Sequence, residues 1–182
     1  MESTLIVYKS KTGFTKRYVE WIAESIACQT VPFDRIDNID LSKFNIIIYG
    51  AGMHAGRVQG LEKFKKKVLI LGGKKIVVFA TGAAPDTEEI ITKIKADNFS
   101  DDELDDIKFF YFQSGINYEK MGLLDKTIMK TYSKVLELKN NKSDIETGTG
   151  EAISSSYDSS NKESIKPMVD YLKQLINKTS RV

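Results

Sequence analysis

Five short apolar runs alternate with helix-like segments along the chain, and this alternation restricts the fold more than any other feature. Runs of mostly β-branched and aromatic residues occupy residues 4–8, 28–33, 44–49, 76–80 and 107–112. The first helix-like segment, residues 14–27, repeats apolar residues at helical spacing, at Val19, Ile22, Ala23 and Ile26. Strands that alternate with helices indicate right-handed βαβ units. We therefore expect an α/β fold in which a five-stranded parallel sheet lies between two helix layers.

The remaining segments complete one domain over residues 1–182. Further helices are expected over residues 61–71, 86–96, 119–138 and 164–177. Gly72 and Gly73 are expected to end the first of these, and Pro167 suits the first turn of the last. Pro32 places the second strand at an edge of the sheet. Residues 139–164 are polar and rich in Gly and Ser, so a partly disordered loop is expected there.

Composition limits the function classes. The chain has 182 residues, of which 41% are apolar, and no apolar run approaches the roughly 20 residues of a membrane-spanning helix. Its start runs directly into a strand, unlike a signal peptide. A single cysteine, Cys28, excludes an internal disulfide and a cysteine-rich metal site, which indicates a reducing, cytoplasmic setting with no metal. The net charge of +2 gives no reason to expect nucleic acid as a partner.

The charged residues gather in two stretches of opposite sign. Residues 61–75 contain six lysines and one glutamate, and residues 97–106 contain six acids and no base. Both stretches are most simply solvated surfaces, the first a helix face and the second a turn. The alternative is a docking patch for a charged partner.

The turn between the first strand and the first helix carries the clearest chemical signal. In an open parallel sheet, ligands bind beyond the carboxyl ends of the strands, near the point where the strand order reverses. This turn offers three hydroxyls, a glycine and a helix N-terminus, a combination that suits a phosphate group. The alternative is a simple helix cap made by Thr12. Neither a Walker A loop nor a dinucleotide fingerprint is present. The residues of the turn are Ser10, Lys11, Thr12, Gly13, Phe14 and Thr15.

The stretch from Val7 to Thr15 resembles the flavodoxin signature, in which an aromatic residue and a Ser or Thr precede a phosphate loop. That resemblance implies a flavodoxin-like fold with strand order 2-1-3-4-5 and a bound flavin mononucleotide (FMN), whose phosphate the turn at residues 10–15 would hold. Two turns rich in Gly and Ala follow the third and fourth strands, where the family places its flavin. The residues that the resemblance assigns to the flavin are Ala51, Gly52, Met53, His54, Ala55, Thr81, Gly82, Ala83, Ala84, Ser114 and Gly115.

A closer resemblance is to the branch of flavodoxin-domain proteins that includes menaquinone-dependent protoporphyrinogen IX dehydrogenase. It lies in residues 49–56, in residues 115–118 and in the helix expected over residues 119–138. Residues 139–144 depart from the pattern of these dehydrogenases. This resemblance implies an FMN-dependent oxidoreductase that acts on a quinone or a porphyrinogen. Two alternatives stay open: an electron carrier that docks on protein redox partners, for which residues 101–106 are the best hint, and a binding module without flavin.

Three further expectations concern access to the flavin. The turns at residues 50–56 and 81–85 contain no Trp, Tyr or Phe, so we expect one flavin face to be open to a small substrate. His54, the only histidine, is a candidate proton donor, although a surface position without a role is the simpler interpretation. The helix at 119–138 is expected to pack its apolar stripe on its own domain; the alternative is peripheral contact with anionic lipid at the inner face of the membrane.

Overall fold

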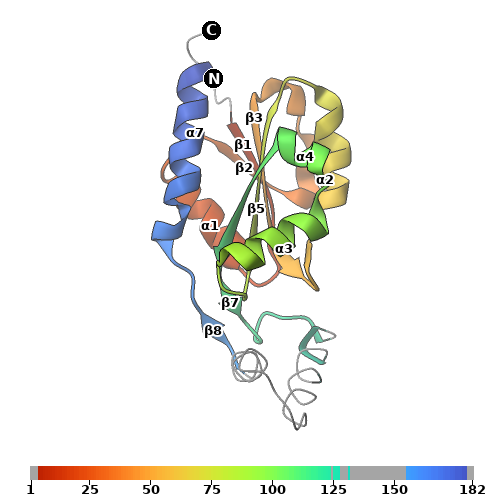
Figure 1. Cartoon of the computed structure of the whole chain (residues 1–182), viewed down its shortest axis with the longest axis vertical. Helices are drawn as coiled ribbons and strands as arrows, with labels where there is room; N and C mark the ends of the chain where they lie inside the picture. The colour runs from red at the N-terminus through yellow and green to blue at the C-terminus, as the bar shows by residue number, and fades with distance from the viewer. Residues whose placement is uncertain (1–3, 124, 128–130, 132–154, 180–182) are drawn as a thin grey trace.

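The computed structural model describes residues 4–123, 125–127, 131 and 155–179, and its centre is a parallel sheet (Figure 1). The long strands lie in the order β2-β1-β3-β5-β6, and all neighbours in this series are parallel. Counted along the chain as five long strands, this is the predicted order 2-1-3-4-5. The strands are β1 (Thr4–Lys9), β2 (Gln29–Pro32), β3 (Ile46–His54), β5 (Lys75–Gly82) and β6 (Ile107–Gln113).

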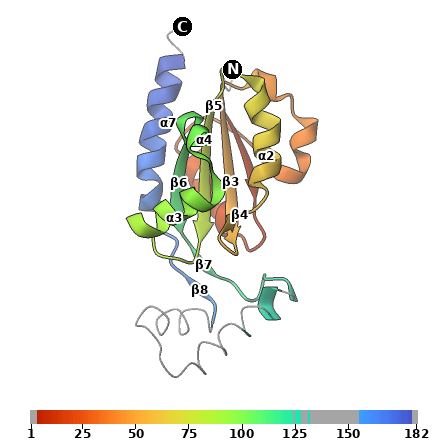
Figure 2. The ribbon, with the colours of Figure 1, turned by 45° about the vertical axis from the view of Figure 1, so that its right-hand side comes forward.

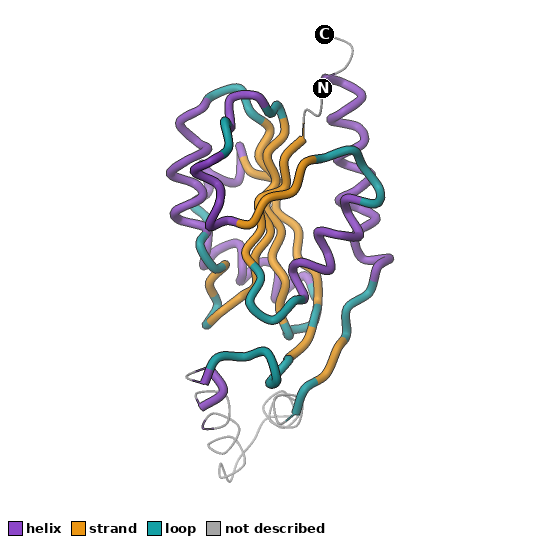
Figure 3. The backbone as a smooth tube through the Cα atoms, turned by 180° about the vertical axis from the view of Figure 1, so that it is seen from behind, coloured by secondary structure: helices purple, strands orange, loops and turns teal. Residues whose placement is uncertain are grey.

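Helices cover both faces of the sheet, as the alternating pattern predicts (Figures 2 and 3). On one face, α1 (Phe14–Ala23) and α7 (Lys166–Thr179) pack on a cluster that includes Ile6 and Ile48. On the other face, α2 (Leu61–Val68) and α3 (Glu88–Asn98) pack on a cluster that includes Leu5 and Ile47. Consecutive strand residues therefore enter opposite cores, which explains why the strands are continuously apolar.

Several element ends differ from the predicted ones because local hydrogen bonds decide them. α1 ends at Ala23 rather than at residue 27. α2 ends at Val68 and tightens into the 3-10 turn η3 (Leu69–Leu71) before two glycines with positive φ. α3 begins at Glu88 because the side chain of Thr87 accepts a hydrogen bond from the backbone N–H of Ile90. Between β2 and β3 the chain forms the 3-10 turns η1 (Phe33–Asn38) and η2 (Leu41–Lys43).

The acidic stretch forms a helix, so the predicted turn is wrong. Residues 101–106 form α4 (Asp101–Asp106), which Ser100 and Glu103 close with a capping box. Each side chain of the box accepts a hydrogen bond from the backbone N–H of the other residue, which starts the helix despite its repelling charges. The basic stretch is not wholly solvated either, because Lys65 is buried and its ammonium lies 2.9 Å from a carboxylate oxygen of Glu103.

Two antiparallel pairings near the carboxyl edge of the sheet were not predicted, one within the sheet and one in a separate two-stranded ladder. β3 continues to His54 and pairs with β4 (Arg57–Val58), so most of the turn predicted at residues 50–56 is strand. Ala55 and Gly56 form the turn itself, with φ of 47° and 76°. Past the end of β6, β7 (Gly115–Ile116) pairs with β8 (Tyr157–Asp158).

The expectations for residues 119–164 are only partly covered by the described residues. The backbone N–H of Met121 donates to the carbonyl of Tyr118, so a turn stands where the helix was expected to begin. Most of the helix expected to residue 138, and residues 139–154 of the expected loop, lie outside the described residues. The rest of that expected loop contains β8 and the 3-10 turn η4 (Lys162–Ile165), and α7 follows with Pro167 in its first turn. No helix among the described residues is long and apolar enough to cross a membrane.

Candidate functional site

The turn between β1 and α1 leaves the N-terminus of α1 without a side-chain cap. Gly13 is the N-cap residue, with φ of 98°, and only glycine adopts this backbone conformation without strain. The Ser10 hydroxyl accepts a hydrogen bond from the backbone N–H of Lys16 at 3.2 Å. Thr12 does not cap the helix, which was the alternative interpretation of this turn. The first amides of α1 therefore face the turn with the positive end of the helix dipole behind them.

A buried pair of hydroxyls joins this turn to the next loop of the edge. The Oγ1 atoms of Thr15 and Thr81 lie 2.8 Å apart, and both residues are almost completely buried. A Cβ atom added at Gly52 would lie 3.7 Å from Oγ1 of Thr15, in ordinary contact. The three turns named by the sequence analysis are thus brought together here. One threonine donates to the other, and the second hydroxyl keeps its proton for another acceptor.

Two tyrosines hold the turn at residues 81–85 by its carbonyls. The hydroxyl of Tyr111 donates to the carbonyl of Ala84 at 2.8 Å, and that of Tyr157 donates to the carbonyl of Ala83 at 3.1 Å. Burial raises the pKa of both phenols above the ordinary value for tyrosine, so both stay protonated as donors. The carbonyl of Gly82 accepts a bond from the backbone N–H of Ser114 at 2.7 Å. The turn is therefore a fixed surface.

The predicted flavin residues differ in exposure. Ala51 is fully buried within the sheet, paired with Lys9 and Ala80, whereas Met53 is half-buried. Ser114 is buried, and at Gly115 an added Cβ would overlap the carbonyl oxygen of Tyr157. Gly115 thus allows β8 to approach β7 closely.

His54 and Ala55 are exposed at the end of the β3–β4 hairpin. Nδ1 of His54 lies 4.0 Å from a carboxylate oxygen of Asp125, and the other oxygen lies 3.6 Å from Nζ of Lys11. Asp125 thereby links the hairpin, the turn at residues 10–15 and the segment after β7. His54 is at the rim of the edge rather than beneath it.

Aromatic side chains do reach this region, although the turns themselves contain none. Tyr118 and Tyr157 pack against Ile116, as does Ala83 of the turn at residues 81–85. Both come from the segments around β7 and β8, which are distant in sequence from the predicted flavin turns. The lack of aromatic residues in the two turns is therefore not enough to predict how open this edge is, because aromatic residues reach it from other segments.

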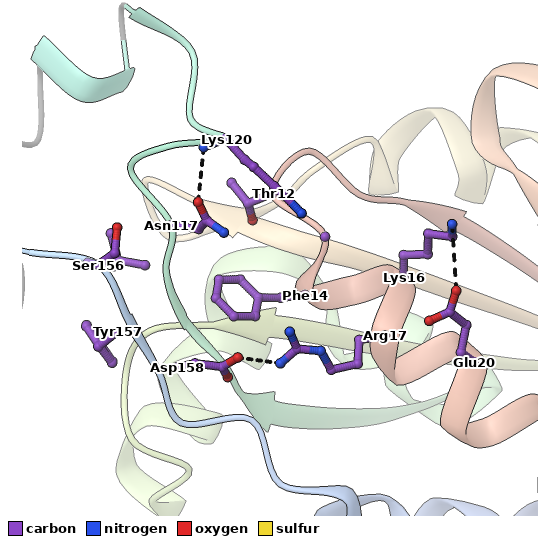
Figure 4. Close-up of a pocket in the computed structure, with 12 residues that line it drawn as sticks. Thr12, Phe14, Lys16, Arg17, Glu20, Asn117, Lys120, Ser156, Tyr157 and Asp158 are labelled. Atoms are coloured by element: carbon purple, nitrogen blue, oxygen red, sulfur yellow. Dashed lines mark hydrogen bonds and ion pairs between the residues drawn. The ribbon is translucent and has the colours of Figure 1, made fainter.

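A pocket of about 420 Å³ lies between the start of α1 and the β7–β8 ladder (Figure 4). The ion pairs of its wall join Arg17 to Asp158 and Lys16 to Glu20. Half of the lining residues come from the start of α1 and the turn before it, and three of these, Thr12, Gly13 and Phe14, were predicted. The other half was missed, although Asn117 lies within the stretch 115–118 that carries the closer resemblance. The lining residues are Thr12, Gly13, Phe14, Lys16, Arg17, Glu20, Ile116, Asn117, Lys120, Ser156, Tyr157 and Asp158.

Comparison with known proteins adds a family match to this geometry. A family model described as a flavodoxin domain matches residues 5–143, which is more than half of the chain. No curated protein matches the chain.

Solved structures with a similar fold include three flavoproteins. An archaeal flavodoxin is 17% identical, with a TM-score of 0.42, over 62% of this chain and 85% of its own. A flavoprotein in complex with FMN from Lactobacillus acidophilus is 16% identical, with a TM-score of 0.40, over 62% and 93%. A flavodoxin, WrbA-like protein from Agrobacterium tumefaciens is 18% identical, with a TM-score of 0.42, over 66% and 88%.

Proposed function

The chain belongs to the flavodoxin domain family, and we propose that it binds FMN at the carboxyl edge of its sheet. The observation that carries this proposal is the turn at residues 10–15. Its N-cap residue, Gly13, has no side chain to cap the amides of α1, of which that of Lys16 donates to Ser10, and its buried Thr15 is hydrogen-bonded to the next turn of the same edge. Amides, hydroxyls and a helix dipole that converge on one point suit a phosphate group.

The residues at this edge fit the parts of FMN. The hydroxyls of Ser10 and Thr12 and the amides of residues 11–14 would hold the phosphate, with Thr15 beneath them. Backbone groups of Gly52 and Met53 would face one side of the flavin ring, and the fixed turn at residues 81–85 would face the other. Ser114 and Gly115 would border its far end. Bound FMN would supply the electron transfer, and the chain would orient the ring and exclude water.

We further propose that the protein is an oxidoreductase with a small substrate, of the quinone or porphyrinogen class. The support is the position of the charged stretches: the acidic helix α4 precedes β6, so it lies at the amino edge of the sheet, opposite the turns that would hold the flavin (Figures 1 and 2). A protein partner docked on α4 would be remote from the flavin. This favours a small substrate over the alternative, an electron carrier that uses α4 to dock.

The first experiment is the absorption spectrum of the purified protein, with the released cofactor identified by chromatography. We expect flavin bands and FMN. Thr81→Val keeps the shape of the side chain but removes the hydrogen bond to Thr15. Because such a hydrogen bond contributes roughly 1 kcal/mol, we expect the variant to bind FMN about fivefold more weakly. Thr92→Val, at an exposed site on α3, is the matched control. Protein that stays colourless and takes up no added FMN would overturn the proposal.

The second experiment separates the enzyme from the carrier. Oxidation of protoporphyrinogen with menaquinone as acceptor is expected for the loaded enzyme, and its absence with this and other small substrates would favour the carrier. His54→Ala tests the histidine in the same assay. Unchanged turnover would remove His54 as a proton donor, which is the outcome its exposed position favours.

A further inference from the structure

We propose that Lys120, from the turn after β7, binds the phosphate of FMN. This inference rests on the proposed function, because it names a charged partner for a ligand whose other partners are neutral hydroxyls and amides. It also gives a binding role to the segment that follows the sheet. A cation near the turn at residues 10–15 is available to a phosphate only if it has no acidic partner already.

Among the residues that the structure describes, four cationic side chains lie in or beside this turn, and three of them are paired with carboxylates. Nζ of Lys11 lies 3.6 Å from Asp125, and Nζ of Lys16 lies 3.7 Å from Glu20. The guanidinium of Arg17 pairs with Asp158. Each of these charges is at least partly neutralised before a ligand binds.

Lys120 is the exception in this group. Within the described part of the chain, no carboxylate pairs with its ammonium, and its one hydrogen bond is made by its backbone N–H, which donates to Oδ1 of Asn117 at 3.0 Å. Its Nζ lies 3.7 Å from the position that a Cβ atom would take at Gly13. Figure 4 shows the side chain extending from its own segment toward the turn, beside Thr12. An unpaired positive charge therefore stands over the glycine N-cap of α1.

The backbone just before Lys120 is anchored to Ser156, the residue that precedes β8. The backbone N–H of Tyr118 donates to Oγ of Ser156 at 2.9 Å, and that hydroxyl donates to a carboxylate oxygen of Glu119 at 2.8 Å. The β7–β8 pairing continues this connection toward the sheet. The backbone at the base of this side chain is thus already held in place, so that only the side chain has to be ordered when a phosphate binds.

The loss of a contact between an ammonium and a phosphate has two signatures that a general disturbance of the fold lacks. It depends on ionic strength, because salt screens exposed charges. It also discriminates between FMN and riboflavin, which share the flavin ring but differ in the phosphate. Together these signatures distinguish a phosphate-binding residue from one that merely supports the fold.

The experiment measures the dissociation constants of FMN and riboflavin by flavin fluorescence, for the wild type, Lys120→Gln and Lys120→Arg. Lys173→Gln, at an exposed position on α7, is a control with the same change of net charge. We expect Lys120→Gln to weaken FMN binding about tenfold at low salt, because it removes a charged hydrogen bond. The dissociation constant of riboflavin should stay within about twofold of the wild-type value. The loss should shrink when salt is raised to about 0.5 M, and Lys120→Arg should retain most of the affinity.

The outcomes separate this inference from the proposal on which it rests. If the wild type binds FMN and Lys120→Gln binds it equally well, the role of Lys120 is wrong and the FMN proposal stands. Equal losses for FMN and riboflavin would also overturn the role, because they would show a general effect on the site. If the wild type binds neither flavin, the proposed function itself fails. Thermal melts of each variant verify that it is folded.

Discussion

Gly50 lies in β3 against the ring of Phe79 in the neighbouring strand β5. A Cβ atom added at Gly50 would overlap three carbon atoms of that ring, and both residues are in the closed interior of the sheet. We expect Gly50→Ala to lower the free energy of unfolding by about 2–3 kcal/mol, because overpacking forces the ring or the strand to move. The measurement is urea denaturation followed by circular dichroism.

Gly52, two residues further along the same strand, provides the matched control. An added Cβ there would make only ordinary contacts, at 3.6 Å or more. Gly52→Ala should therefore cost less than about 1 kcal/mol. Similar losses for the two variants would contradict the packing argument.

These two glycines also show what the sequence can and cannot predict for single residues. Both lie in the turn expected at residues 50–56, but the resemblance assigned only Gly52 to the flavin. Gly52 does border the buried Thr15–Thr81 pair at the edge. Gly50 is instead required by an aromatic ring 29 residues away in the chain, a contact that depends on strand register and leaves no local pattern.

The contact between α2 and α4 is electrostatic. The ammonium of Lys65, only 7% exposed, lies 2.8 Å from Glu62 and 2.9 Å from Glu103. Partial burial raises the pKa of the Glu103 carboxyl, but the hydrogen bonds from Lys65 and from the backbone of Ser100 outweigh it, and the pKa lies below its usual value. A carboxyl whose pKa is lowered on folding stabilises the folded state above its unfolded pKa. That contribution is lost as the pH falls through the folded pKa.

Glu103→Gln removes this charge but keeps an amide oxygen for the capping box. We expect it to lower the free energy of unfolding by about 1 kcal/mol at neutral pH. The difference from the wild type should disappear in acid, below the usual carboxyl range. Denaturation across a pH series is the measurement, and Glu62→Gln, whose carboxylate is 73% exposed, is the control with a smaller expected effect. A difference that persists at low pH would exclude the ionised carboxylate as its source.

The long strands and the helices other than α4 could be predicted because each is set by a local apolar pattern. The short antiparallel pairs, β3–β4 and β7–β8, could not, because two-residue strands have no periodicity of their own. The capping box of α4 was present in the sequence as Ser100 and Glu103, three residues apart. It was overlooked because a run of acids suggests a solvated turn.

In the whole molecule, the candidate flavin site and the acidic helix α4 lie at opposite edges of one sheet. β6 has seven residues, so the distance between its two ends is roughly 20 Å. Exposed charges at this distance are screened at physiological salt, where the Debye length is about 8 Å. The acidic helix therefore has little electrostatic influence on a ligand at the carboxyl edge.

Neutralisation of α4 tests this separation. A variant with Asp101, Asp102, Asp105 and Asp106 changed to Asn should bind FMN and accept electrons from a small reductant within about twofold of the wild type, because of screening. Stopped-flow reduction of the loaded protein is the measurement. A large loss of electron transfer to a protein partner, with small reductants unaffected, would instead support the carrier and its docking on α4.

The sequence predicted one wall of the candidate site. The turns after β1, β3 and β5 meet because parallel strands end at the same edge. The second wall, from residues 116–120 and 156–158, depends on a pairing between segments about 40 residues apart, with only two residues in each strand. Nothing in either segment alone predicts that the two meet over the turn at residues 10–15.

The β7–β8 pairing also has a consequence for how the segment between these two strands can vary in length. Ile116 and Tyr157 are register partners, so the two ends of the segment at residues 117–156 are fixed side by side. The entropy of closing a loop grows only with the logarithm of its length, and a doubling costs about 0.6 kcal/mol. A change in the length of this segment is therefore expected to cost little in loop-closure entropy, because the pairing holds its ends together whatever lies between them.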